Sequence, residues 1–191
     1  MLTPNYRALI HASSILVPVL VKLTSKPLIL VGLGVVTVAY VIEELLRFRE
    51  RRVPLISQFT LKMSRQDERS HFIAAPVFLA LGIILALILF PQSIAYSSIA
   101  VVAVGDPVAG YVGRRFGRNH VGGKTWEGFA VGSMAAFVPT LLFVSPFVGA
   151  IGSIAGMSLE LSGVFQDNLT IPFAAGIAMF LASIVMVSIV L

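Results

Sequence analysis

Seven long apolar runs constrain the fold of this chain more than any other feature of its sequence. A helix needs about 20 mostly apolar residues to cross the hydrocarbon core of a bilayer. With 57% of its 191 residues hydrophobic and only 12% charged, the chain cannot bury its apolar surface as a soluble domain. We therefore predict an all-α, polytopic integral membrane protein, a single domain (1–191) with about seven transmembrane helices. The predicted segments are 8–21, 28–46, 71–90, 93–113, 129–147, 148–165 and 169–191.

The composition also excludes several classes of protein. The chain contains no cysteine, which excludes disulfide staples, thiol nucleophiles and Cys-based metal sites. Its formal net charge is +5. In a membrane protein such basic residues report the orientation of the loops and anionic partners. We therefore expect the bilayer and an anionic ligand as partners, and no nucleic acid.

The basic residues predict how the chain lies in the membrane. If the N-terminus, 47–70, 114–127 and 166–168 share one side, all basic residues of the chain except Lys22 and Lys26 fall on that side. Because cytoplasmic loops carry an excess of Lys and Arg, we predict a multi-pass protein of the cell membrane with a cytoplasmic N-terminus. The acidic residues fall at or near the same face, and we place the active site there.

The polar region 47–70 separates the second and third apolar runs. Apolar residues recur in it at helical spacing, with Arg and Lys between them. This pattern indicates an amphipathic helix that lies in the membrane interface. An ordinary solvated loop is the alternative interpretation.

Asp106 lies well inside an apolar run, about seven residues from its cytoplasmic end. A carboxylate at such a position is costly, by about 2.5–3.5 kcal/mol on insertion scales, and therefore indicates a function. Gly105 precedes it, and Pro107 follows it. Because proline has no N–H, the carbonyl of Ala103 loses its helical partner. A carboxylate beside a free carbonyl predicts a site for a hard cation; an Asp that pairs with an Arg for packing is the alternative.

A basic, glycine-rich segment (114–127) follows Asp106 and predicts a phosphate-binding loop. Arg, Lys and Thr side chains and the N–H groups of glycines are typical ligands of phosphate. The segment is not a Walker A motif, because Arg118 stands where that motif needs glycine. The candidate ligands are Gly105, Gly110, Gly113, Arg114, Arg115, Gly117, Arg118, Gly123, Lys124 and Thr125, and Glu127 follows them. The glycines are also typical of close helix packing, which leaves room for a homodimer.

Polar residues in other segments complete the set of candidates. Asp167 and Asn168 open the last apolar run, where capping explains one of them but not both. Glu160 is a second acid inside an apolar run, and His11 lies in the first run. Glu43 and Arg47 are one helical turn apart, which suits either a surface ion pair or a functional role.

The run G-D-P-V-A-G-Y-V-G-R-R-F-G-R-N-H-V-G-G-K-T-W-E-G (105–128) resembles the signature of CTP-dependent membrane lipid enzymes. One such family contains dolichol (polyprenol) kinase, phytol kinase and a CTP-dependent diacylglycerol kinase. The related family is phosphatidate cytidylyltransferase. The opening Arg7-x-x-x-His11 and the run D-N-L-T-I-P (167–172) are similar to the kinase family. The G-H-G-G-x-x-D-R-x-D run of the cytidylyltransferases is missing.

The resemblance implies a CTP-dependent kinase that transfers the γ-phosphoryl group of CTP to the hydroxyl of a polyprenol, dolichol, phytol-like alcohol or diacylglycerol. It implies Mg²⁺ as cofactor, held with CTP by Asp106 and Asp167. Glu127 would hold metal or position Lys124. The phosphates would bind Lys124 and the three arginines of the segment, with its glycines, Thr125 and Asn168 around the nucleotide.

Two other functions stay open from the sequence. The first is cytidylyl transfer to a lipid phosphate, which Trp126 in G-K-T-W-E-G favours because bacterial cytidylyltransferases share this run. The second is a transporter or scaffold without enzymatic activity, in which Asp106 and Glu160 line an ion path. Inverted repeats are typical of many transporters, and the sequence has no evident repeat.

Overall fold

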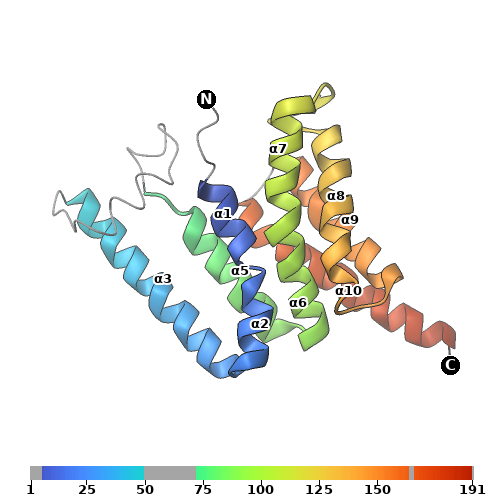
Figure 1. Cartoon of the computed structure of the whole chain (residues 1–191), viewed down its shortest axis with the longest axis horizontal. Coiled ribbons are helices and arrows are strands. Elements are labelled where there is room, and N and C mark those ends of the chain that lie inside the picture. The colour runs from blue at the N-terminus through green and yellow to red at the C-terminus, as the bar shows by residue number, and fades with distance from the viewer. Residues whose placement is uncertain (1–5, 50–71, 164–165, 191) are drawn as a thin grey trace.

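The computed structural model describes residues 6–49, 72–163 and 166–190, and this part of the chain is mostly helical (Figure 1). Two short strands, β1 (His120–Val121) and β2 (Lys124–Thr125), form an antiparallel hairpin between helices. The helices are α1 (Tyr6–Ser13), α2 (Leu16–Leu23), α3 (Lys26–Phe48), α5 (Ala75–Leu89), α6 (Gln92–Ala100), α7 (Asp106–Phe116), α8 (Trp126–Thr140), α9 (Pro146–Ser162) and α10 (Asp167–Val190), with a π-helical turn, η2 (Val101–Gly105), between α6 and α7.

The all-α prediction is confirmed, and each predicted apolar segment is helical over most of the residues described. Within the described residues, three helices are long and apolar enough to cross a membrane, namely Lys26–Arg47, Gln92–Phe116 and Asp167–Ser188. The others are shorter: α5 has 15 residues and α9 has 17. At 1.5 Å per residue, a helix of 15 residues is about 22 Å long, less than the hydrocarbon core of about 30 Å.

The structure differs from the predicted segments at two places. The first segment is divided into α1 and α2, and the Ser14 hydroxyl donates a hydrogen bond to the His11 carbonyl at this break. Pro18 has no N–H to donate to the Ser14 carbonyl, so the regular helical hydrogen bond is missing at this break. The predicted phosphate-binding loop is only partly a loop, because α7 continues to Phe116 and the hairpin follows. Beyond Arg49, the segment 47–70, in which we predicted an interfacial helix, lies outside the described residues.

The core of the bundle forms around α6 and η2. The side chains of Ile99, Val101 and Val102 are fully buried there, and α5, α8, α9 and α10 pack around these two elements. The π-helical turn ends at Gly105, immediately before Asp106 and Pro107. Because proline provides no N–H to the preceding turn, a widened turn at this place has a direct cause. The first residue after this turn is Asp106.

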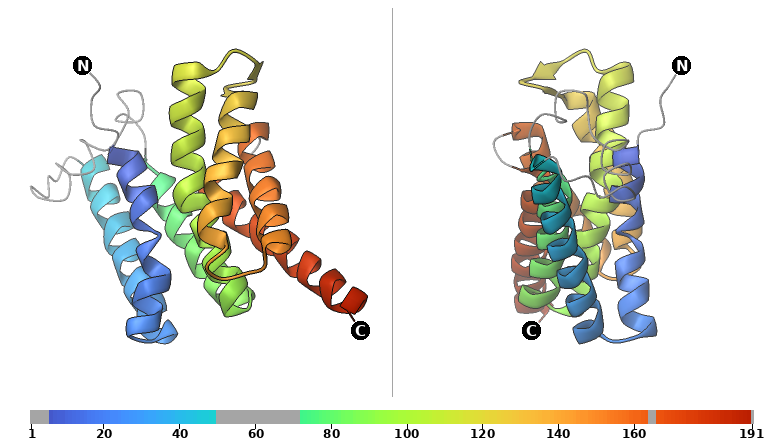
Figure 2. Two further views of the ribbon diagram at one scale, coloured as in Figure 1. Left: turned by 45° about the vertical axis from the view of Figure 1, so that its right-hand side comes forward. Right: turned by 90° about the vertical axis from the view of Figure 1, so that its left-hand side faces the viewer.

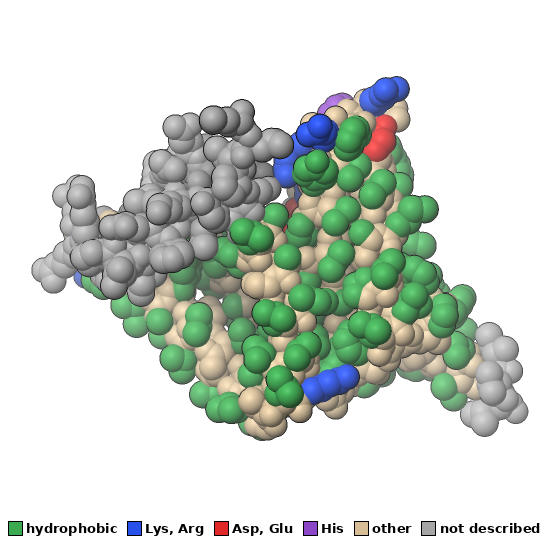
Figure 3. Space-filling model, viewed as in Figure 1, with side chains coloured by type: hydrophobic (Ala, Val, Ile, Leu, Met, Phe, Trp, Pro, Cys, Tyr) green, Lys and Arg blue, Asp and Glu red, His purple; other side chains and the backbone are tan. Residues whose placement is uncertain are grey.

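The two ends of the bundle differ in charge. Lys and Arg side chains gather around the end that carries α7 and the hairpin, whereas basic atoms are scarce at the opposite end in this view (Figure 3). α1 begins at the end with the hairpin, and α10 runs to the opposite end (Figure 2). This polarity agrees with the separation of the basic residues in the sequence.

Helix α3 lies at the edge of the bundle beside α5 (Figure 1). The Tyr40 hydroxyl donates to the backbone oxygen of Ile73 at 2.8 Å, and the backbone N–H of Ile73 donates to Glu44 at 2.8 Å. Arg47 donates to the same carboxylate at 2.6 and 2.9 Å. These bonds attach the end of α3 to the start of α5. Glu43, which the sequence singled out together with Arg47, is also buried.

Candidate functional site

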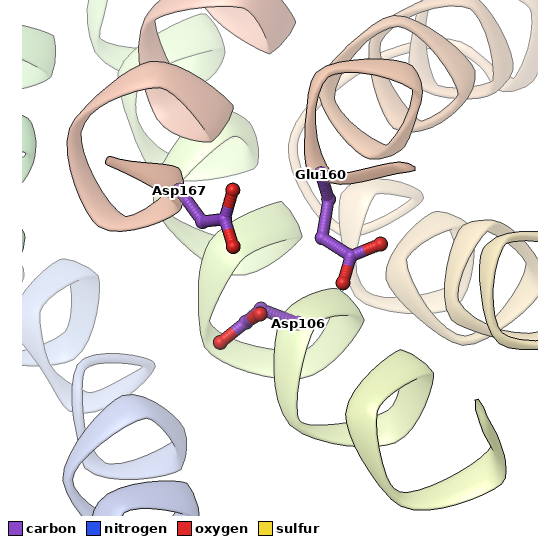
Figure 4. A group of neighbouring side chains, drawn as sticks. All are labelled: Asp106, Glu160 and Asp167. Atoms are coloured by element: carbon purple, nitrogen blue, oxygen red, sulfur yellow. The ribbon is translucent and has the colours of Figure 1, made fainter. Parts of the chain in front are cut away.

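Three carboxylates from three helices converge at the polar end of the bundle. Asp106 is the first residue of α7, Glu160 lies in the last turn of α9, and Asp167 is the first residue of α10. One oxygen of each lies within 4.8 Å of the others. Figure 4 shows the three side chains pointing toward one another. We call this group the carboxylate triad.

Helix ends bring these residues together. Gly163 ends α9 with a φ of +59°, a left-handed conformation that glycine adopts without strain. The chain then reverses into α10, so that Glu160 and Asp167 come to face each other. Asp106 enters from the central α6–η2–α7 segment. The triad therefore depends on contacts between residues up to 61 positions apart in the sequence (106–167).

Lys124 reaches the triad from the β-hairpin. Its ammonium nitrogen lies 2.5 Å from Glu160 Oε1 and 2.7 Å from Asp167 Oδ2. Burial lowers the pKa of Lys124, but the hydrogen bonds and charges of Asp167 and Glu160 outweigh burial and raise this pKa above its usual value. Lys124 is therefore a cation at neutral pH and neutralises part of the charge of the triad.

His11 approaches the triad from α1. Its side chain is buried, and Nδ1 lies 3.0 Å from Asp106 Oδ2. This is a close polar contact, and Nδ1 has no hydrogen-bond partner among the described residues. The sequence named His11 only as a secondary candidate, because a single histidine in an apolar helix gives no indication of its partner.

The charges of the site favour a bound cation. Three carboxylates face Lys124 and one imidazole, so the group stays negative unless a carboxylate is protonated. Only 2% of the Glu160 side chain is exposed, and a buried carboxylate needs compensating charge. Oxygen ligands alone suit hard cations such as Mg²⁺ and Ca²⁺. The residues present therefore fit a divalent cation of this kind.

Most of the predicted phosphate-binding glycines pack against other parts of the protein. A side chain on Gly113 or Gly117 would collide with Thr125, and one on Gly105 would lie 2.6 Å from Met157 Sδ. These glycines bring α7 against β2 and η2 against α9, and so help to position Lys124. A side chain on Gly110 would contact the guanidinium of Arg114, whereas the space around Gly123 is open.

The arginines predicted as phosphate ligands lie on the exposed surface near the hairpin. Arg114 and Arg115 belong to the last turn of α7, and Arg118 follows it. Arg115, Arg118 and Glu127 line a surface cavity of about 570 Å³ together with Phe116, Gly117 and Asn119. Thr125 is buried and accepts a hydrogen bond from the Gly128 N–H at 3.1 Å, which caps the start of α8.

Glu127 lies outside the triad and forms hydrogen bonds to Asn119, the residue that precedes the hairpin. Its carboxylate accepts the backbone N–H of Asn119 at 3.2 Å and the side-chain amide of the same residue at 2.8 Å. Hydrogen bonds from its own backbone N–H and from those of Arg118 and Asn119 keep the pKa of Glu127 below its usual value, although burial opposes this. Its contacts favour a role in shaping the loop over one in metal binding.

Asn168 likewise has a packing role. It is buried, and its amide donates to the Ala75 carbonyl at 2.8 Å, which holds the start of α10 against α5. The structure places Asp106, Lys124 and Asp167, which the sequence named as candidates, at one site. The prediction from the sequence placed Glu160 among the secondary candidates, although an acid inside an apolar helix is itself a signal of function.

The chain matches no protein-family model, and no solved structure matches it significantly. An uncharacterized protein of Rickettsia prowazekii (strain Madrid E), RP860, is 25% identical to it over 181 residues, covering 88% of this chain and 89% of that protein. The similarity extends over nearly the full length of both proteins and brings no activity with it.

Proposed function

We propose that this chain is a CTP-dependent lipid alcohol kinase of the dolichol, phytol and diacylglycerol kinase type. One observation carries the proposal. Asp106 and Lys124 come from the run that resembles the lipid enzymes, Asp167 comes from the separate D-N-L-T-I-P run, and all three meet at one site with Glu160. Packing alone gives no reason for these polar residues to gather at the end of an apolar bundle.

In the proposed reaction, the hydroxyl oxygen of the lipid forms a bond to the γ-phosphorus of CTP. The bond between this phosphorus and the oxygen of the β-phosphate breaks, CDP leaves, and the hydroxyl proton passes to a carboxylate or to water. Phosphoryl transfer depends mainly on positioning and on neutralising charge. Bound Mg²⁺ would supply part of that neutralisation.

The residues divide between two tasks. Asp106, Glu160 and Asp167 would hold Mg²⁺, because their oxygens lie close enough to share one ion. Lys124 would bind a phosphate of CTP, and the exposed arginines beside the hairpin would bind the others. The hydroxyl of the lipid would reach the triad from the bilayer between the helix ends.

The proposed topology has seven spans, with the N-terminus and the site on the cytoplasmic side. The three long apolar helices and the unequal charge of the two ends support it. The shorter helices would cross where the bilayer is locally thin or with polar residues reaching to the interface.

The proposal can be tested by measuring which phosphorus of CTP is transferred to the lipid. Purified protein is incubated with Mg²⁺, a panel of lipid alcohols and phosphatidate, and CTP labelled at either the α- or the γ-phosphorus. A kinase moves the γ label into the lipid alcohol. Movement of the α label into phosphatidate would instead identify a cytidylyltransferase, and no movement of either label would contradict both enzymatic functions.

A further inference from the structure

We propose that Lys124 competes with the divalent cation for Glu160 and Asp167, and that it moves from these carboxylates to the phosphates of the nucleotide when the metal–nucleotide complex binds. This inference rests on the proposed function, because it assigns the order of events at the same site. Lys124 would pair with two kinds of anion in succession, first the carboxylates and then the phosphates.

The contacts of Lys124 motivate the proposal. Its ammonium bridges two of the three carboxylates whose oxygens lie within 4.8 Å of one another. A divalent cation that uses these carboxylates would lie close to the ammonium in a half-buried site, where like charges repel strongly. The two cations therefore exclude each other from the triad. His11 stays beside the third carboxylate, that of Asp106, at 3.0 Å.

The local structure allows Lys124 to leave without unfolding. Its side chain is 27% exposed, and it lies on a hairpin whose turn has open space at Gly122 and Gly123. The next residue, Thr125, is buried and caps α8, so the backbone is anchored directly beside the lysine. The movement thus requires only rotation of the flexible four-carbon stem.

The competition couples the metal to the nucleotide. Metal that arrives alone displaces the ammonium without bringing an anion to receive it. Metal that arrives with phosphates brings anions that receive the displaced ammonium. Binding of the metal and binding of the nucleotide should therefore each strengthen the other by the same factor.

A titration with Mn²⁺ alone, followed by electron paramagnetic resonance, tests the competition without measuring activity. Lys124→Met should bind Mn²⁺ at least about tenfold more tightly than the wild type, within the usual range of coupling between sites. Lys26→Met makes the same substitution at an exposed lysine outside the site and should change the affinity less than about twofold. Equal or weaker binding by Lys124→Met would overturn the inference.

A second measurement uses the wild-type chain and therefore does not depend on the folding of a variant. Acetylation of lysines, quantified by mass spectrometry, should be slow at Lys124 without metal and faster at saturating Mn²⁺. The exposed Lys26 is the internal standard. If Mn²⁺ binds but Lys124 is acetylated as slowly as without metal, the proposed displacement of Lys124 would be overturned, and the proposed metal site would not. Failure of Mn²⁺ to bind would overturn this inference together with the proposed metal site, whereas the CTP label experiment tests the proposed reaction separately.

Discussion

Replacing Gly82 with alanine tests whether the packing of α5 against α10 positions the site. A Cβ at Gly82 would lie 2.6 Å from the backbone oxygen of Asn168 and 3.0 Å from Pro172 Cγ. A backbone oxygen cannot rotate away, so the start of α10 must shift. Overpacking costs about 1–3 kcal/mol, and alanine regains about 1 kcal/mol of helix propensity. The net loss of up to about 2 kcal/mol should lower Tm by roughly 4–8 °C.

A matched substitution separates packing from helix propensity. Gly34 lies in α3 with no atom within 4 Å of its Cβ position, so Gly34→Ala should leave Tm unchanged or raise it. Unfolding in detergent can be followed by the fluorescence of Trp126, the single tryptophan of the chain. In Gly82→Ala, the shifted start of α10 should also displace Asp167 and reduce phosphoryl transfer. Equal Tm values for the two variants would refute the packing argument.

Two further predictions concern the hairpin and the topology. Because the pKa of Glu127 is lowered in the folded protein, its stabilising effect is present above its unfolded value of about 4.5 and is lost as the pH falls through the folded value. The difference in Tm between wild type and Glu127→Gln should therefore be constant near neutral pH and shrink in acid, and a difference that grows in acid would contradict it. In this cysteine-free chain, a membrane-impermeant maleimide applied to intact cells should label Lys22→Cys but not Arg118→Cys. Labelling of both, or of Arg118→Cys alone, would contradict the topology.

Apolar patterning predicted the helices because the signal lies within each segment. The break after Ser13 and the π-helical turn before Asp106 depend on single residues, Pro18 and Pro107, which have no N–H. Length alone could not establish seven spans, because α5 and α9 are shorter than a typical transmembrane helix.

The sequence predicted which residue types form the candidate site better than it predicted which of them contact one another. Asp106 and Lys124 stood out because charge is scarce in the chain. The partners of Lys124 could not be read from spacing, since Glu160 and Asp167 follow it by 36 and 43 residues. The role of Glu127 was ambiguous for the same reason, because its hydrogen bonds to Asn119 depend on the hairpin.

Substitution of Glu160 tests the proposed metal-binding centre most directly. Glu160 does not belong to the motifs on which the family resemblance rests, and the structure places it beside Asp106 and Asp167. In Glu160→Gln, Mg²⁺-dependent transfer of the γ label from CTP to lipid alcohol should fall by more than about 100-fold, since even indirect partners of metal ligands contribute about 10–100-fold. The variant should also need more Mg²⁺ for its residual activity. A wild-type rate at wild-type Mg²⁺ concentration would contradict a single metal-binding centre formed by α7, α9 and α10.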